Sequence, residues 1–304
     1  MPLPPTSLEF LSIEEVRSQW KNHQKLTQAI TQPMRIRKSR QQRHPVFDFI
    51  HTYYSFSLGR LEKWHPGVGF AIQKPEELEL SSKYYRRHEE TYWIDPSLLT
   101  TKGRDRLEWI KNLLEKTQAR APMLACHGLH EWAMVFAGDD VRHRESAPLR
   151  LTQTEIDEIV KTRPICCSHF DAFRFFTPSA KPLNKIHPTL LAREEYEQPG
   201  CIHANMDLYK WAYKSSPWIS SKLLRETLFF AIEAREIDMR ASPYDLREYG
   251  YDPIKIETKE GRREYEQLQN ELYLKGLPLR QSLIDSLAKI LSFSHAPERK
   301  TESI

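Results

Sequence analysis

The sequence is poor in glycine, with 10 glycines among 304 residues, whereas about 7% is usual. Doubly wound nucleotide-binding folds need glycine at their phosphate-binding turns, and all-β folds need it at hairpins. The scarcity of glycine therefore favours a mainly helical fold. The 20 prolines predict many short and rigid connections between the helices.

The sequence also lacks any run of 18 or more apolar residues, so it predicts no membrane-spanning helix. The first ten residues, MPLPPTSLEF, have neither the basic region nor the apolar run of a signal peptide. There are only four cysteines, two of them adjacent. Without a secretion signal, we expect reduced thiols and a cytoplasmic location.

What the sequence does contain is enough apolar material for a real core, since 39% of the residues are hydrophobic and 11% are aromatic. No internal repeat and no low-complexity linker divides the chain. We expect a basic helix and linker over 1–43, one large helical catalytic domain over 44–293, and a disordered tail over 294–304. A small β element near 69–96 is the main exception to the helices.

Apolar periodicity and capping residues predict the individual elements. Residues 33–43 should form a basic linker and residues 164–200, with their five prolines, should be irregular. A further short strand is expected at 254–258. The predicted helices are 13–31, 44–64, 100–118, 126–137, 152–161, 202–215, 220–239, 261–275 and 278–293.

The positive charge is concentrated at the N-terminus. The whole chain has a net charge of +4, and residues 1–50 carry eight Lys/Arg against four Asp/Glu. The rest of the chain is therefore neutral. A basic arm on a neutral body is suited to contacts with the phosphates of DNA, although an exposed helix and linker that are simply basic would have the same composition.

Histidine and carboxylate recur together in the least polar segments of the chain. A buried carboxylate in such surroundings is costly unless it is paired or binds a metal. In the first and last of the four groups, spacings of i, i+4 and i+7 place the side chains on one helix face. The groups are His44, Asp48 and His51; His127, His130 and Glu131; His169 and Asp171; and His203, Asp207 and Lys210.

Three interpretations of these groups remain open. Each His can bond a neighbouring carboxylate in a purely structural role. Alternatively, His130, His169 and His203 converge with Glu131, Asp171 and Asp207 on a divalent metal such as Fe, Mn or Zn. In the third interpretation, one of these carboxylates acts without metal as a general base or electrostatic stabiliser.

Two narrower metal sites are also compatible with the spacing. His169-x-Asp171 with the distant His203 is the pattern of a facial triad of a non-haem iron oxygenase. The repeated Cys-x-His of Cys167/His169 and Cys201/His203 offers two thiols and two imidazoles to zinc.

Other residues are candidates for binding a substrate. Tyr53, Tyr54 and Trp64 could stack against a base, although aromatic residues at helical spacing are also typical of a core. Arg174, Lys210 and Arg240 each lie in an apolar or turn-rich segment, where the alternative is an ion pair with a nearby Asp. The glycine turn in KWHPGVGFAI is similar to the DNA-binding turn of a helix–hairpin–helix, or is a simple turn into a strand.

Several strings, in sequence order, carry a resemblance to a bacterial family commonly labelled 3-methyladenine DNA glycosylase. They cover about residues 44 to 290 and read HPVFDFIHTYYSF, WHPG, GLHEWAMVF, CSHFDAFRFFTP, QPGCIHANMDLYKWAY and RASPYDL. The resemblance implies excision of alkylated purines from DNA.

On that resemblance, a flipped base would enter an aromatic pocket. Asp171, Asp207 or Glu131 would be the carboxylate that stabilises the cationic sugar. Tyr53, Tyr54 and Trp64 would enclose the base, and the residues that hold phosphates would be Arg35, Arg37 and Arg40.

The leading functional prediction is therefore a DNA glycosylase for alkylated purines such as 3-methyladenine, with DNA bound through the basic N-terminal arm. The alternative, which rests on the residues alone, is a helical His/carboxylate metalloenzyme, a hydrolase or an oxygenase, that acts on a small molecule. A non-enzymatic binding protein with a structural polar network is a third possibility.

Overall fold

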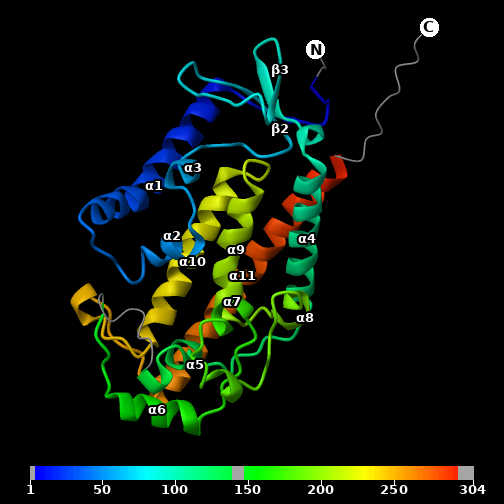
Figure 1. Ribbon diagram of the computed structural model, residues 1–304. Coiled ribbons are helices and arrows are strands. Elements are labelled where there is room, and N and C mark those ends of the chain that lie inside the picture. Colours follow the sequence, from blue (N-terminus) through cyan, green and yellow to red (C-terminus); the bar gives the residue numbers. More distant parts are fainter. Residues whose placement is uncertain (1–3, 139–146, 294–304) are drawn as a thin grey trace.

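The computed structural model describes residues 4–138 and 147–293, and it confirms the prediction of a mainly helical fold with a small β element. Figure 1 shows long helices side by side, with shorter helices and loops around them. The helices are α1 (Ile13–Ser39), α2 (Phe49–Tyr54), α3 (Leu58–Leu61), α4 (Thr101–Gln118), α5 (Leu129–Ala133), α6 (Gln153–Thr162), α7 (Phe170–Phe173), α8 (Arg193–Tyr196), α9 (Ile202–Ser215), α10 (Ser221–Arg240) and α11 (Lys259–Phe293).

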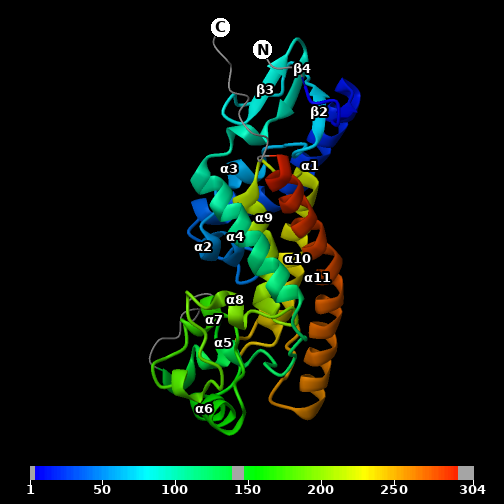
Figure 2. The same ribbon diagram turned by 90° about the vertical axis from the view of Figure 1, so that its right-hand side faces the viewer.

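Helix α9 lies at the centre of the long helices and packs against α10 and α11. Every residue of α9 except Lys214 is buried, including the charged Asp207 and Lys210, as expected for a helix that the rest of the protein surrounds. Helix α4 packs against α11. Figure 2 shows the sheet at one end of these helices and α5 to α8 toward the other end.

The sheet has four short strands in the order β1-β2-β4-β3. Strand β1 (Glu9–Leu11) pairs in parallel with β2 (Phe70–Gln73), and β4 (Thr91–Ile94) pairs antiparallel with β2 and with β3 (Tyr85–His88). Strands β2, β3 and β4 all lie within the β element predicted near 69–96. Strand β1 was not predicted, because its partner residues in β2 lie 61 positions further along the sequence.

Four of the predicted helices are found with almost the expected ends, namely α4, α6, α9 and α10. The start of α6 is fixed by the expected capping box, in which Thr152 accepts from the Glu155 N–H while the Glu155 carboxylate accepts from the Thr152 N–H. Local sequence signals were sufficient for these helices.

The predicted helices over 44–64 and 126–137 are wrong in extent. Only α2 and α3 form within the first, because Ser55 has a left-handed backbone (φ 52°) and Ser57 caps α3. Within the second, His127 and Gly128 also have positive φ, so that helix α5 begins only at Leu129. The apolar composition of both segments reflects burial rather than long helices.

The predicted breaks at two prolines are also wrong. The basic linker over 33–43 is helical through Ser39 as part of α1, and the two closing helices are the single helix α11 with Pro278 inside it. A proline leaves the carbonyl four residues earlier without its helical donor. Those residues are Ala29 and Leu274, which are both exposed, so water can take the place of the donor.

Two smaller predictions remain. The strand expected at 254–258 is absent from the described chain, where this segment is irregular although Ile254 and Ile256 are buried. The tail expected over 294–304 lies outside the described residues. Among the residues that are described, no helix combines the length and the apolar character needed to cross a membrane.

The glycine turn before β2 is a structural turn into a strand. The Val68 N–H donates to the Trp218 carbonyl at 2.8 Å, and a Cβ at Gly67 would come within 2.6 Å of the Ser220 nitrogen. This backbone packs closely against the loop before α10. The interpretation as a turn into a strand is therefore favoured over a DNA-binding turn.

Candidate functional site

Three of the predicted histidines lie in a row inside the protein. His130 comes from α5, His203 from the first turn of α9, and His169 from the N-cap of α7. The ring centroids of His130 and His203 are 4.6 Å apart, and those of His203 and His169 are 5.5 Å apart. All three are buried, and burial lowers the pKa of His203 to about 3, so its imidazole is neutral.

At one end of the row, His130 belongs to a buried ion network. Its Nε2 donates to Asp238 at 2.6 Å, and Arg235 donates from one nitrogen to both Asp238 and Glu131 at 2.7 Å. Burial would lower the pKa of His130, but the Asp238 carboxylate outweighs it and raises that pKa well above its usual value. The two positive groups of this network, His130 and Arg235, thus balance its two negative groups, Asp238 and Glu131.

At the other end of the row, His169 faces two buried carboxylates. Its Nε2 lies 3.3 Å from Asp207 Oδ2 and 3.6 Å from Glu197 Oε1. The Lys210 ammonium donates to the same Asp207 oxygen at 2.6 Å. Burial would raise the pKa of Asp207, but Lys210 and His169 outweigh it, so the pKa is lowered and the carboxylate is ionised.

Asp171 lies one step nearer to solvent than Asp207. Its Oδ2 accepts from Lys210 at 2.9 Å and also from the Arg193 guanidinium, while Arg174 lies 3.4 Å from Oδ1. Burial would raise the pKa of Asp171, but Lys210 outweighs it and the pKa is lowered to about 2. This carboxylate is therefore ionised at neutral pH, in contact with three cations.

Above Asp171 the surface opens into a pocket between the α2–α3 segment, α7 and α9, with about 430 Å³ of empty volume. Three of its lining residues carry positive charge and one carries negative charge, so the pocket suits an anionic group. The lining residues are Tyr53, Tyr54, Phe56, Asp171, Arg174, Lys210 and Lys214.

The aromatic side of this pocket is a continuous stack of rings. Tyr54 stacks on Phe56 with centroids 5.5 Å apart, and Phe56 stacks on Tyr213 at 4.0 Å. Tyr53 meets Tyr54 edge to face at 4.9 Å. The rings that line the pocket are only half-buried, so they can contact a planar ligand.

Tyr54 connects the pocket to the buried row of histidines. Its hydroxyl donates to Asp207 Oδ1 at 2.7 Å, across 153 positions of sequence. This bond holds α2 against α9, and it leaves Asp207 in contact with the protein on both of its oxygens. A ligand in the pocket would contact Asp171 directly. It would interact with Asp207 only indirectly, through Tyr54 and Lys210, which both bind that carboxylate.

Within residues 4–138 and 147–293, two groups of buried side chains have ligand atoms close enough together to hold a metal ion. They are His130 with His203 and Asp238, and His169 with Glu197 and Asp207, and within each group the ligand atoms lie within 4.8 Å of one another. The carboxylates of Asp207 and Asp238 already bind Lys210 and Arg235. These cations compete with a metal for the same oxygens.

Other sequence predictions fall outside the pocket. Trp64 is part of the hydrophobic core, Glu131 pairs with Arg235 at the far end of the histidine row, and Arg240 lies near Glu236 and Glu264. None of these three is among the described residues that line the pocket.

The two narrower metal sites do not assemble as expected. Among the described residues, the groups of close ligand atoms place His169 with Glu197 and Asp207 rather than with Asp171 and His203. These groups contain no cysteine either, so the two-Cys, two-His zinc set is not preformed.

The basic arm is partly neutralised. Arg35 pairs with Glu62 at 2.6 Å, and Arg37 binds Asp48 at 2.9 Å. Arg40 is the exposed C-cap of α1. Contacts between this arm and DNA remain a prediction.

Sequence reasoning missed several residues of the site. Glu197 and Arg193 lie in the proline-rich segment, where no periodicity indicates which side chains turn inward. Arg235 and Asp238 could have been found, because both fall on the same helical stripe as the apolar residues Leu224, Leu228 and Ala231. A charged pair on a buried stripe requires a buried partner, and Glu131 is that partner.

Comparison with known proteins gives no relative, since the chain matches no protein-family description, no curated protein and no solved structure. The resemblance to DNA glycosylases therefore stays a prediction from the sequence strings. The geometry of the site has to carry any functional proposal.

Proposed function

We propose that the protein hydrolyses N-glycosidic bonds and that the pocket above Asp171 receives the nucleotide unit, most readily an alkylated purine nucleotide of DNA. One observation carries the proposal. Five of the residues selected from the sequence for binding or catalysis come from three separate segments and line this one pocket, and they are Tyr53, Tyr54, Asp171, Arg174 and Lys210.

The two sides of the pocket match the two parts of a nucleotide. A flipped base can lie against the half-buried rings of Tyr53, Tyr54 and Phe56, since stacking on aromatic side chains is how proteins hold unstacked bases. Arg174 and Lys214 line the same pocket, where their cationic groups suit phosphate oxygens. The net positive charge of the lining favours a polyanionic substrate.

The chemistry assigned to Asp171 is electrostatic. When the bond from C1′ to the base nitrogen breaks, its electron pair leaves with the base and the sugar becomes cationic. An alkylated purine is already cationic, so it leaves without first being protonated. An ionised Asp171 stabilises the sugar cation, and water then bonds to C1′ while its proton passes to the carboxylate or to solvent.

Lys210 and Tyr54 are positioning residues in this scheme. Lys210 bridges Asp171 and Asp207, at 2.9 and 2.6 Å, and thereby fixes the orientation of the pocket-facing carboxylate. Tyr54 anchors its own ring through Asp207. Asp207 thus supports both the aromatic wall and the cation that holds Asp171.

The experiment is release of free base from DNA methylated on purine nitrogens. Wild-type protein should release methylated purine, and Asp171→Asn should reduce the rate about 100-fold or more, since preorganised electrostatic groups have effects of that size. Asp245→Asn is the matched control, because Asp245 is a carboxylate paired with Arg247 outside the pocket.

Asp245→Asn should leave the rate unchanged. Absence of base release by well-folded wild-type protein would contradict the proposal, and so would equal rates for Asp171→Asn and wild type. Thermal unfolding of each variant establishes that a lost rate does not come from lost structure.

A second candidate function, a His/carboxylate metalloenzyme that acts on a small molecule, is favoured by the two groups of close ligand atoms in the histidine row. In one of them, the imidazole of His169 and the carboxylates of Glu197 and Asp207 are suitable ligands for Fe, Mn or Zn. A metal bound in this way would be lost in Glu197→Gln and Asp207→Asn, and elemental analysis of the purified variants measures that loss.

A further inference from the structure

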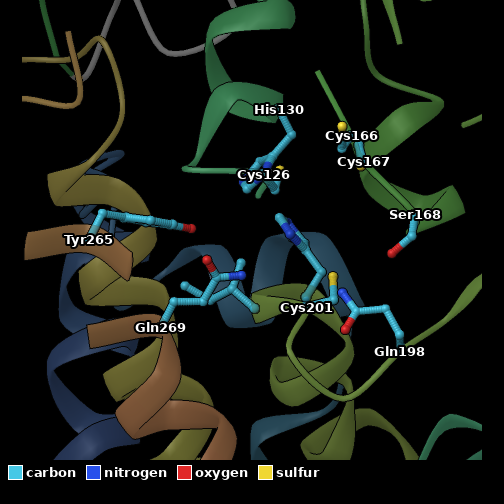
Figure 3. Close-up of a pocket in the computed structure, with 11 residues that line it drawn as sticks. Cys126, His130, Cys166, Cys167, Ser168, Gln198, Cys201, Tyr265 and Gln269 are labelled. Atoms are coloured by element: carbon cyan, nitrogen blue, oxygen red, sulfur yellow. Dashed lines mark hydrogen bonds between the residues drawn. The ribbon is translucent and has the colours of Figure 1, made fainter. Parts of the chain in front are cut away.

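All four cysteines of the chain lie around one small pocket, separate from the pocket above Asp171. Cys126 precedes α5, Cys166 and Cys167 follow α6, and Cys201 is the N-cap of α9. The pocket has only eleven lining residues, drawn in Figure 3. All four cysteines are free thiols.

His130 faces the same pocket in the arrangement of a metal ligand. Its Nδ1 lies 3.3 Å from the Cys126 sulfur, while its Nε2 donates to Asp238 at 2.6 Å. Histidines that bind metals usually donate their second ring N–H to a carboxylate, which fixes the ring and leaves the other nitrogen for the metal. Asp238 is itself held by Arg235.

Polar atoms without partners point to a missing occupant. Figure 3 shows Tyr265 and Gln269 directed from α11 toward the pocket. Both are buried, with 0% and 1% of their surfaces exposed. Within the described chain, the Tyr265 hydroxyl and the Gln269 Oε1 atom have no hydrogen-bond partner. Such groups are costly when buried unless something else satisfies them.

We propose that this pocket binds a thiophilic metal through Cys126, His130 and Cys201, with Cys166 or Cys167 completing the set. Thiolate and imidazole together select zinc, copper(I) or iron–sulfur clusters over hard cations. Binding displaces to solvent the thiol protons and the proton that His130 carries on Nδ1. The inference is independent of the proposed glycosidase activity, because the pocket above Asp171 contains none of these residues.

The spacing of the sulfurs distinguishes two kinds of centre. A tetrahedral zinc ion holds its sulfurs about 3.8 Å apart, because each Zn–S bond is about 2.3 Å. Among the described residues, the groups with ligand atoms within 4.8 Å include no cysteine. A single ion would therefore draw the thiols inward, whereas the protein ligands of an iron–sulfur cluster bind different iron atoms and lie farther apart.

Cobalt(II) is the probe for a single ion, since thiolate ligation gives intense near-ultraviolet absorption. We expect about one Co²⁺ per metal-free chain with these bands, competed by Zn²⁺. For a cluster, protein purified without oxygen should contain iron and acid-labile sulfide. Either signal should disappear in Cys126→Ser and Cys201→Ser and should weaken in His130→Gln.

His187→Gln is the matched control for His130→Gln, because His187 is an exposed histidine outside the pocket lining. It should behave like wild type. Asp207→Asn and Glu197→Gln should also keep the metal, which separates this centre from the His/carboxylate site. Wild-type protein that shows neither cobalt–thiolate bands nor iron and sulfide would overturn the proposal.

Alkylation of the folded wild-type protein tests the same centre without any variant. Zn²⁺ should slow the reaction of iodoacetamide with Cys126 and Cys201 at least several-fold, as measured by mass spectrometry of the peptides. Equal alkylation rates with and without Zn²⁺ and Co²⁺, in protein that lacks a cluster, would also contradict it.

Discussion

At the scale of single residues, the protein depends on charges buried in matched sets. Arg235 is fully buried and binds both Glu131 and Asp238, and Lys210 in the same way binds both Asp171 and Asp207. Each cation holds two carboxylates that come from different segments. The cations therefore set the positions of the groups on which both proposed sites rest.

Removing the Arg235 guanidinium should be strongly destabilising. Arg235→Met should lower the free energy of unfolding by about 3 to 5 kcal/mol, because it leaves the buried Glu131 without its cation and Asp238 with His130 alone. Arg247→Met is the control, since Arg247 pairs with Asp245 at the surface with 70% of its side chain exposed, and the loss there should be below about 1 kcal/mol.

Urea unfolding followed by circular dichroism measures both variants. Similar losses in the free energy of unfolding for Arg235→Met and Arg247→Met would show that the buried ion network does not stabilise the fold. They would contradict the claim that this network holds the histidine row in place.

At the scale of elements, the central position of α9 depends on the close approach of α11. A Cβ on Gly276 would come within 2.6 Å of the Asn205 Oδ1 atom and 3.2 Å of the Phe230 ring. That same Asn205 oxygen accepts from the buried Arg280 at 2.7 Å. A glycine inside a long helix is thus explained by packing against its neighbour.

Gly276→Ala should therefore destabilise the protein, although alanine is intrinsically the better helix residue. Overpacking costs about 1 to 3 kcal/mol, which exceeds the gain of about 1 kcal/mol in helix propensity. Gly59→Ala in α3 is the matched control with open space around it, since the nearest atom would lie at 3.9 Å.

In thermal unfolding, Gly276→Ala should lower the melting temperature, whereas Gly59→Ala should leave it unchanged or raise it slightly. A Gly276→Ala protein as stable as wild type would show that α11 does not constrain α9.

The elements that sequence predicted well are those with local start and stop signals. Thr152 and Glu155 defined α6 within four residues, and this signal needs no tertiary partner. The segment 44–64 could not be divided correctly in the same way. Its turn at Ser55 is held by contacts such as the bond from Tyr54 to Asp207, which joins residues far apart in sequence.

At the scale of the whole molecule, the sequence predicted which residue types would form the site better than how they would combine. His203, Asp207 and Lys210 were expected on one face of a helix, and α9 does place Asp207 and Lys210 in contact. Their partners Glu197 and Arg193 come from the short helix α8 and its C-cap, within the proline-rich segment. Only the folded chain determines which of its side chains turn inward.

The three histidines illustrate the same limit. Their convergence was one of three open interpretations, and the structure brings their rings into a row. The sequence prediction of a zinc site used only Cys167 and Cys201, yet all four cysteines gather around one pocket. A few reactive residues that come together only in the folded chain produce no periodic pattern in the sequence.

The central claim is that the pocket above Asp171 receives a nucleotide unit and stabilises positive charge on its sugar. The most direct measurement is the affinity for two DNA duplexes that differ at one position, which is either a normal nucleotide or a cationic pyrrolidine abasic analogue. We expect wild-type protein to bind the analogue duplex at least about 10-fold more tightly, and Asp171→Asn to lose that preference. Equal affinities of the wild-type protein for the two duplexes would contradict the claim.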